Sequence, residues 1–396
     1  MASHTLDDQR LAKRVGLFPE SIIREMTRHA NEHKAINLAQ GFPGWNPPEV
    51  VIEAAQAALA GDHNQYAITW GAPELRRAIA DKTQWFNGLT VDPEREITVT
   101  CGATEAMMAA LMAVVNDGDE VIVFEPFYEN YGPDAALSGA RLRFVPLHPD
   151  RGFRFDSDEL AAAFTPRTKA IIVNTPANPS GTVFSADELR LIGDLCKAHD
   201  AFLITDEIYE HILYDGRSHV APATLADHRE RTIMISGASK TYSMTGWRVA
   251  WTIAPPAITT AIRRVHDFLT VGAAHPLQIG VARALHLPRS YYDDLRREYA
   301  EKRKFLVAAL NHHGFACEAP EGAYYIMADF RDVAPQKDMD DVAFAMWLVR
   351  EGGLAGVPAS SFFHHKDLGR DHIRFHFAKS MGLLRQASTR LEALRV

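Results

Sequence analysis

The sequence predicts an α/β protein with a mainly parallel, seven-stranded sheet flanked by helices and a smaller α+β domain. From about residue 96, short β-rich runs alternate with helical segments, roughly one unit in every 25 to 35 residues, as in repeated βα units. After about Leu285 this alternation ends and a long charged helix follows. We therefore expect an N-terminal arm and part of the small domain over 1–47, a large domain over 48–285 and a small domain over 286–396.

Each expected element follows from a local signal. A helical pattern runs over residues 19–33, and a second helix, 49–60, starts just after Pro48, as helix-start preferences favour. Ser185 is followed three positions later by Glu188, the signature of a capping box at a helix start. The seven expected strands are 96–100, 120–124, 141–145, 169–173, 201–205, 232–235 and 248–253, and the long charged helix is 291–312.

Composition narrows the class of protein. The 396 residues are 47% hydrophobic and 23% charged, which excludes disordered and fibrous proteins. Basic and acidic residues are interspersed with a net charge of −8, so neither nucleic acid nor an anionic membrane is an expected partner. The polar N-terminus differs from a signal peptide, and the longest apolar run, 106–115, is too short to cross a bilayer. Three widely separated cysteines indicate a reduced protein, so we expect a cytoplasmic location.

Polar and aromatic residues follow five of the expected strands directly. In open α/β sheets, ligands bind beyond the carboxyl ends of the strands. Strand 96–100 leads into Gly102-Ala-Thr-Glu, where the free N–H groups of a helix start suit a phosphate. The residues that follow the other four strands include Tyr128, Asn178, Asp206, Tyr209 and Lys240.

Two cationic residues are candidates for chemistry. Lys240 lies among small residues between two strands, so we expect it on a loop and not on a helix face. A desolvated lysine amine can form a Schiff base with a carbonyl, although a lone lysine is more often a solvated charge. In the segment 372–377, Arg374 alternates with apolar residues, which predicts a strand with Arg374 opposite its buried face.

Seven motifs in order make the chain resemble the pyridoxal-phosphate enzymes of fold type I, and among them the class I/II aminotransferases. The resemblance runs from about Asn37 to Lys379. Within the class, the chain looks similar to the kynurenine, glutamine and methionine aminotransferases. The motifs are Gln40-Gly-Phe-Pro43, Asn64-Gln-Tyr66, Gly102-Ala-Thr-Glu-Ala106, Asn178-Pro-Ser-Gly181, Asp206-Glu-Ile-Tyr209, Ser239-Lys-Thr-Tyr-Ser-Met-Thr-Gly-Trp-Arg248 and Ile373-Arg-Phe375.

The resemblance implies an aminotransferase that moves an amino group between an L-amino acid and a 2-oxo acid by a ping-pong Schiff-base mechanism. Pyridoxal 5′-phosphate is the implied cofactor. Lys240 would bind it covalently and later shuttle the proton of the substrate's Cα. Asp206 would pair with the pyridine nitrogen, and Tyr209 would hydrogen-bond the phenolic oxygen. Arg374 would hold the substrate's α-carboxylate in a bidentate pair.

The resemblance also implies a set of binding residues and a homodimer. Tyr66 would reach the phosphate of the neighbouring subunit, so that the active site lies at the subunit interface. Gly41, Trp45 and Asn178 would complete the substrate site, and no metal is expected. The remaining residues implied to bind the cofactor are Gly102, Ala103, Thr104, Tyr128, Asn178 and Arg248.

One position departs from the family pattern. The family commonly has a phosphate-binding serine three residues before the Schiff-base lysine, whereas this chain has Gly237 there. Ser236 and Ser239 flank the glycine. Either a neighbouring serine, with Ser239 as the hypothesis, a water or a backbone N–H replaces the usual serine, or the phosphate has fewer contacts.

Two other functions and the substrate stay open at this stage. A β-lyase acting on cysteine conjugates would use the same scaffold. A non-catalytic half of a transcription regulator is disfavoured, because no basic helix-turn-helix sequence precedes residue 16. No motif places a second arginine for a dicarboxylate, so we favour aromatic, sulfur-containing or other neutral amino acids. The adjacent histidines at 312–313 and 364–365 lack the spacing of metal ligands.

Overall fold

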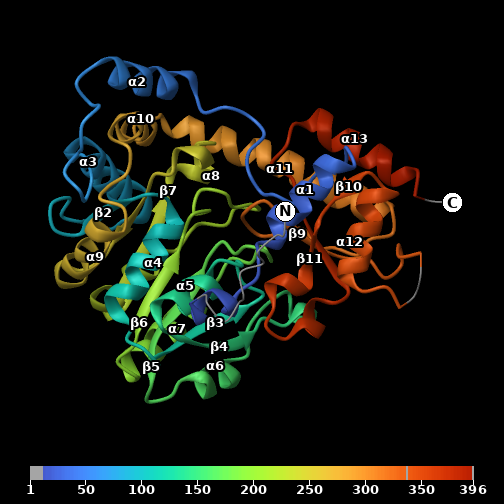
Figure 1. Cartoon of the computed structure of the whole chain (residues 1–396), viewed down its shortest axis with the longest axis horizontal. Coiled ribbons are helices and arrows are strands. Elements are labelled where there is room, and N and C mark those ends of the chain that lie inside the picture. The colour runs from blue at the N-terminus through green and yellow to red at the C-terminus, as the bar shows by residue number, and fades with distance from the viewer. Residues whose placement is uncertain (1–11, 336–337, 395–396) are drawn as a thin grey trace, which may run out of the picture.

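The computed structural model describes residues 12–335 and 338–394, and its largest element is a seven-stranded sheet (Figure 1). The strand order is β2-β8-β7-β6-β5-β3-β4. Neighbouring strands are parallel except for β8, which is antiparallel to both β2 and β7. The strands are β2 (Ile97–Thr100), β3 (Glu120–Glu125), β4 (Arg141–Pro146), β5 (Thr168–Asn174), β6 (Phe202–Asp206), β7 (Thr232–Gly237) and β8 (Ala250–Ile253). All seven expected strands are confirmed.

Both faces of this sheet are buried, because alternate residues of its strands pack into two different hydrophobic clusters. In β5, Ala170 and Ile172 join the cluster under α4 and α9, whereas Ile171 and Val173 join the cluster under α6 and α7. Strands buried on both sides read as continuous apolar runs, and this is why the sequence marked them clearly. The helices of this part are α2 (Glu49–Ala60), α3 (Pro73–Lys82), α4 (Ala103–Val114), α5 (Tyr131–Ser138), α6 (Ser157–Ala163), α7 (Ala186–Ala198), α9 (Pro256–Leu269) and α10 (His275–Leu285).

Local signals in the sequence hold at several helix starts. Helix α2 has the predicted bounds, with Pro48 as its N-cap residue. Helix α7 carries the predicted capping box, in which Ser185 accepts from the backbone of Glu188 and the Glu188 side chain accepts from the backbone of Ser185. Helix α1 is Ile22–Glu32, inside the expected range. No helix in the described residues is both long and apolar enough to span a bilayer.

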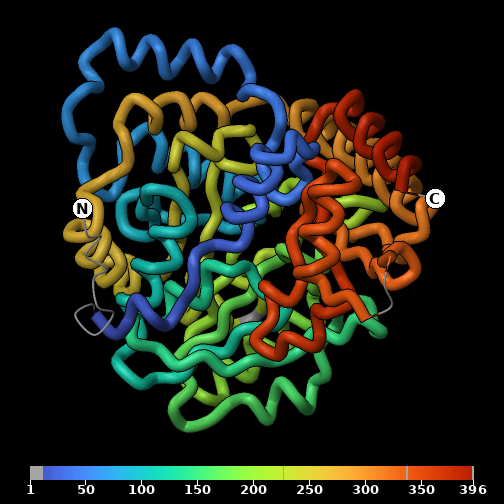
Figure 2. The backbone as a smooth tube through the Cα atoms, turned by 45° about the vertical axis from the view of Figure 1, so that its right-hand side comes forward, coloured from blue at the N-terminus to red at the C-terminus, as the bar shows by residue number. Residues whose placement is uncertain are grey.

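The C-terminal part is a separate layer that includes the N-terminal helix (Figures 1 and 2). A three-stranded sheet has the order β11-β12-β9, and strand β1 pairs in parallel with β10. Residues of α1 share one hydrophobic cluster with these elements, so the two ends of the chain build one core. The division at residues 47 and 285 stays a prediction. The elements are β1 (Ile36–Asn37), α11 (Arg289–His312), β9 (Tyr325–Asp329), α12 (Asp341–Arg350), β10 (Leu354–Ala355), β11 (Val357–Pro358), β12 (His372–His376) and α13 (Met381–Glu392).

Two local expectations around Lys240 are wrong. The lysine lies on a single-turn helix, α8 (Ala238–Thr241), and not on a loop. A four-residue turn is too short to show helical periodicity, so the small residues alone suggested a loop. Strand β8 begins at Ala250 and not at residue 248, because Arg248 has a left-handed backbone with φ of 54°.

Candidate active site

A cavity of about 820 Å³ lies at the carboxyl ends of β3, β5, β6 and β7, where the topology predicts a ligand. The C-terminal layer closes it from the other side through Tyr325 and Arg374. Ten of the expected site residues line the cavity: Gly41, Ala103, Thr104, Tyr128, Asn178, Asp206, Tyr209, Lys240, Arg248 and Arg374.

Lys240 is partly buried at the centre of this set. Its Nζ lies 3.4 Å from the backbone oxygen of Gly41 and 5.8 Å from the centre of the Tyr209 ring. Burial lowers the pKa of Lys240, while Tyr325 and Asp206 act in the opposite direction. A lowered pKa favours the neutral amine, which is the form that acts as a nucleophile or a base.

Asp206 ends β6 with its carboxylate fixed by two donors. The Tyr131 hydroxyl donates to Oδ2 at 2.8 Å, and the backbone N–H of Ile208 donates to Oδ1 at 3.2 Å. Burial raises the pKa of Asp206, although these two hydrogen bonds and the charge of Lys240 favour the ionised form. A buried carboxylate held in this way suits a pairing with a protonated ring nitrogen.

An anion cradle lies at the start of α4. Gly102 is the N-cap residue with φ of 88°, and a Cβ there would lie 2.2 Å from Arg248 Nη2. Glycine is therefore required both by its backbone conformation and by the approach of the guanidinium. The N–H groups of the first helical turn, with Ala103 and Thr104, and the fork of Arg248 suit a phosphate.

Arg374 has the orientation of a carboxylate receptor. It is fully buried on β12, where Nη1 donates to Oδ1 of Asn178 at 2.7 Å and Nη2 donates to the backbone oxygen of Ala39 at 2.6 Å. Its guanidinium lies over the ring of Tyr325, 4.4 Å from the ring centre. Its Nε has no hydrogen-bond partner among the described residues, so donor capacity is left for a ligand. The expected strand is confirmed, although the face that carries Arg374 is buried too.

Tyr209 shares a hydrogen bond with a tyrosine that the sequence did not single out. The hydroxyls of Tyr209 and Tyr325 are 2.9 Å apart, and burial is the main cause that raises the pKa of Tyr209 well above its usual value. The Tyr209 phenol therefore stays protonated at neutral pH and can donate a hydrogen bond.

Three expected site residues are not part of the cavity lining: Gly102, which contacts Arg248 at the start of α4, Trp45 and Tyr66. The Trp45 ring packs against Tyr299, with Lys302 Nζ 3.6 Å from the centre of a Trp45 ring. Trp45 thus packs on α11, and its contact with a substrate side chain stays a prediction. Tyr66 is 86% exposed on the segment after α2, so its side chain is largely uncovered by the described residues.

The departure at Gly237 has a steric cause. Gly237 pairs with Ala250 of β8, and a Cβ at residue 237 would lie 2.7 Å from the Ala250 Cβ. A serine side chain has no room in this position. Ser239 lines the cavity, whereas Ser236 donates to Oε1 of Glu210 at 2.5 Å.

Sequence reasoning missed three supporting residues. Tyr131 fixes Asp206, Tyr325 contacts both Tyr209 and Arg374, and Asn174 joins two strands' ends by bonding the backbone of Asp206 and of Asn178. Asn174 directly follows the expected strand 169–173, so the rule that ligands bind beyond strand ends could have found it. Tyr131 and Tyr325 carry no local signal, because their roles depend on contacts between distant segments.

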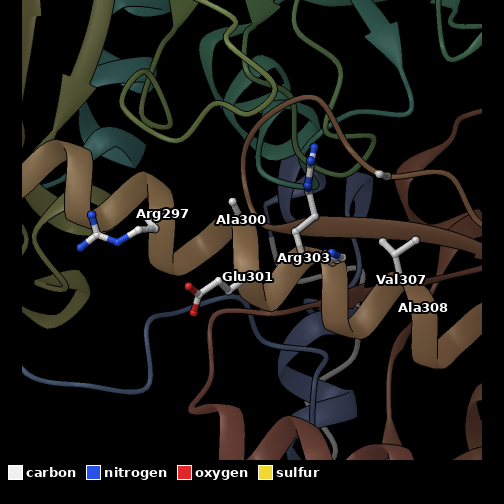
Figure 3. Close-up of a pocket in the computed structure, with 8 residues that line it drawn as sticks. Arg297, Ala300, Glu301, Arg303, Val307 and Ala308 are labelled. Atoms are coloured by element: carbon white, nitrogen blue, oxygen red, sulfur yellow. The ribbon is translucent and has the colours of Figure 1, made fainter.

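Two other features show no comparable chemistry. A shallow hollow along α11 is lined by residues such as Arg297 and Glu301, while Arg303 extends away to pair with Asp215 (Figure 3). Elsewhere Glu207, Glu210 and His219 come close enough to hold a metal ion. Glu210 already receives the ammonium group of Lys82 at 2.5 Å, so a cation of the protein lies in that cluster.

Comparisons with known proteins agree with this geometry. The family model described as "Aminotransferase class I and II" matches residues 33–391. The chain belongs to this family. Methionine aminotransferase of Escherichia coli (strain K12) is 40% identical over 378 residues, 94% of this chain and 96% of the relative. Kynurenine–oxoglutarate transaminase 1 of Homo sapiens is 35% identical and covers 94% of this chain and 95% of the relative.

Solved structures show the same fold. N-succinyldiaminopimelate aminotransferase from Mycobacterium tuberculosis is 38% identical and has a TM-score of 0.94, covering 97% of this chain and 100% of that chain. The protein is therefore an aminotransferase that depends on pyridoxal phosphate, as its family does. The cavity fits this cofactor, because a reactive amine, a buried carboxylate and an anion cradle surround one space.

Proposed function

We propose that this aminotransferase transfers amino groups from L-amino acids with aromatic, sulfur-containing or other neutral side chains to 2-oxo acids by a ping-pong mechanism. The observation that carries the proposal is an apolar wall, the set of apolar residues that line the same cavity as Arg374 and Lys240. Apolar side chains suit neutral substrates because each buried CH₂ group contributes about 0.8 kcal/mol. The apolar and aromatic residues that line the cavity include Ile23, Phe42, Met107, Met108, Tyr128, Leu137 and Leu269.

In this mechanism the protein binds the substrate and moves one proton. Arg374 binds the α-carboxylate, held in orientation by its bonds to Asn178 and Ala39. The Lys240 Nζ, once free, takes the proton from the Cα of the amino donor, and in the second half-reaction it gives a proton to the former carbonyl carbon of the 2-oxo acid. Among the described residues it is the only lysine that lines the cavity. Pyridoxal phosphate, when bound, supplies an aldehyde that condenses with amino groups and a ring that delocalises the electron pair left at Cα. Asp206 stabilises positive charge on the ring nitrogen.

A single-turnover experiment tests the proposal. The enzyme, loaded with cofactor, is mixed with a panel of amino acids without an acceptor, and the change in cofactor absorbance is followed. We expect methionine, phenylalanine and similar donors to convert the cofactor to its aminated form and to release the corresponding 2-oxo acid. Release of pyruvate and ammonia from β-substituted substrates in place of this conversion would favour a β-lyase and contradict the proposal.

Replacement of the lysine tests the assigned chemistry. We expect Lys240→Ala to lose covalent cofactor binding and turnover, because no other lysine in the described parts of the chain lines the cavity. The absorbance spectrum after dialysis and the transamination rate measure both effects. Lys304→Ala is the control, because Lys304 is exposed and lies outside the cavity. Lys82→Ala would not serve, since Lys82 is buried in an ion pair with Glu210. Sustained transamination by Lys240→Ala would rule out this role.

We also propose that the enzyme is a homodimer in the cytoplasm. Large apolar side chains are exposed on two segments, one around Thr69 and one around the end of α9. A hydrogen bond of 2.8 Å between His266 Nε2 and the backbone oxygen of Thr69 joins these segments. Contiguous exposed apolar surface is typical of an interface. All three cysteines are free thiols, as suits a reducing compartment. The exposed residues are Tyr66, Ile68, Phe268, Leu269 and Val271.

A further inference from the structure

Four cationic side chains line the cavity, and the mechanism uses only three of them. Lys240, Arg248 and Arg374 have roles with the cofactor or the α-carboxylate. The fourth is Arg24, on the first turn of α1. The sequence offered no reason to single it out, because α1 precedes the first motif at Gln40 and no motif includes it.

Arg24 has an exposed side chain. It forms no ion pair or side-chain hydrogen bond with a carboxylate in the described part of the chain, although its charge helps to lower the pKa of Glu20, which pairs with Arg28. Arg28, one turn further along the same helix, differs in this respect, since it pairs with Glu20 at 2.5 Å and does not line the cavity. An unpaired arginine keeps all five of its N–H donors for a ligand.

The helix that carries Arg24 is fixed at the cavity rim from two sides. Ser21 caps α1 by accepting from the Arg24 backbone at 3.3 Å, and its hydroxyl donates to Oε1 of Glu129 at 2.5 Å. Thr27 donates to Oε1 of Gln40, another residue of the cavity lining, at 3.1 Å. Figure 2 shows this blue segment passing from the large sheet to the C-terminal layer. Arg24 therefore has a defined place at the rim.

We propose that Arg24 determines specificity by binding a second carboxylate at the far end of a substrate, while Arg374 binds the α-carboxylate. This deepens the function proposed above and rests on it. The donor half-reaction with a neutral amino acid uses the apolar wall and leaves Arg24 in solvent. The acceptor half-reaction then takes a dicarboxylic 2-oxo acid, whose second carboxylate pairs with Arg24. A guanidinium matches a carboxylate through two parallel hydrogen bonds.

The carboxylate of Glu129 opposes the binding of a dicarboxylic substrate near Arg24. Its carboxylate also lines the cavity and is held by Ser21, so it adds negative charge near the rim. If the negative charge of Glu129 dominated at the rim, dicarboxylates would be repelled. Arg24 would then only neutralise the charge of Glu129. The two arrangements predict opposite effects of removing each charge, which makes them separable.

Acceptor specificity of the holoenzyme tests the proposal. The kcat/KM is measured for oxaloacetate, 2-oxoglutarate and 2-oxoadipate, and for the neutral acceptor phenylpyruvate, with one neutral amino donor. We expect Arg24→Leu to lower kcat/KM for the best dicarboxylate by about 10- to 100-fold, as for loss of a charge-assisted contact, and to leave phenylpyruvate within about twofold. Arg24→Lys should retain part of the preference, because it keeps the charge and loses the fork.

Matched variants and a binding measurement complete the test. Arg28→Leu removes a charge from the same helix outside the cavity and should leave the ratio of dicarboxylate to neutral kcat/KM unchanged. Calorimetric binding of unreactive glutarate should weaken in Arg24→Leu. Glu129→Gln, which can still accept from Ser21, should raise the ratio by a few fold; a fall would overturn the proposal.

The two proposals fail in different ways. Absence of transamination by the unaltered enzyme with any neutral donor would refute the proposed function. Normal transamination with an unchanged ratio in Arg24→Leu, or an equal loss for both acceptor classes, would overturn the role of Arg24 alone.

Discussion

Ser236 and Ser239 lie on either side of Gly237, and their side chains have different surroundings. Ser239 lines the cavity beside the start of α4, while Ser236 bonds to the buried Glu210. The sequence could not separate these two serines, because the direction of each side chain depends on where β7 ends and α8 begins. Ser239 as the substitute for the usual phosphate-binding serine stays a prediction, which its place in the cavity lining permits.

We expect Ser239→Ala to retain pyridoxal phosphate more weakly than the unaltered enzyme. Loss of a hydrogen bond to a charged group costs about 1.5–3 kcal/mol, a factor of roughly 10 to 100 in affinity. The dissociation constant of the cofactor, measured by absorbance after dialysis, checks this. Ser236→Ala is the control, which should destabilise the fold by stripping Glu210 of a donor and leave cofactor affinity unchanged. Equal retention by Ser239→Ala would contradict the assignment.

A second residue of the cavity has an unusual titration. Burial raises the pKa of Asp134 to about 7, with the charge of Asp206 adding to the effect and the hydrogen bond from Asn130 opposing it. The unfolded chain loses this proton at a lower pH than the folded chain does. Stability from this group is therefore present at acid pH and is lost as pH rises through about 7.

Asp134→Asn should remove this pH dependence. Asparagine keeps the acceptor for Asn130 and has no charge to bury, so the variant should gain stability over the unaltered enzyme at alkaline pH, by about 4 kcal/mol at most. Thermal unfolding at about pH 5 and about pH 8.5 measures the difference, which should grow with pH. Asp187→Asn, at an exposed position on α7, is the control. An equal effect at both values would contradict the prediction.

At the scale of elements, the sequence predicted the regular alternation of strands and helices and missed the single-turn helix α8. The strands of the large sheet are apolar on both faces and were identified, as was α7 from Ser185 and Glu188. The antiparallel direction of β8 was also not predicted, since the pattern of residues along a strand is the same in either direction. That direction matters, because it sets Gly237 against Ala250.

The β7–β8 pair therefore makes a prediction about Gly237. Gly237→Ala should destabilise the protein by about 1–3 kcal/mol, because the new methyl group overlaps Ala250. The double variant Gly237→Ala with Ala250→Gly should recover part of this loss. The thermal midpoint of the holoenzyme measures both. Gly132→Ala is the control, since a Cβ at Gly132 meets no atom within 4 Å. Absence of any recovery in the double variant would contradict the steric explanation.

At the scale of the molecule, the sequence predicted most residues of the site, but not how the C-terminal layer closes the cavity around them. Arg374 and Asn178 are 196 positions apart and were both predicted, because the family motifs mark them. Tyr325, Arg24 and Glu129 were not, because a cavity between two layers is made by tertiary contacts that leave no periodic signal. Tyr66 was predicted from the same motifs, and its role toward a neighbouring subunit stays a prediction that its 86% exposure permits.

The exposed apolar surface around Tyr66 provides the last prediction. Phe268 is 92% exposed at the end of α9, next to a segment that lines the cavity. We expect Phe268→Glu to weaken the homodimer, because a charge would be buried without a partner, and to lower cofactor affinity with it, since Tyr66 would no longer reach a neighbouring phosphate. Sedimentation over a range of concentrations and cofactor absorbance check both effects. Val342→Glu, on the exposed side of α12, is the control. A stable dimer with normal cofactor affinity in Phe268→Glu would exclude this surface from the interface, whereas a monomer that keeps full cofactor affinity would exclude Tyr66 from the site.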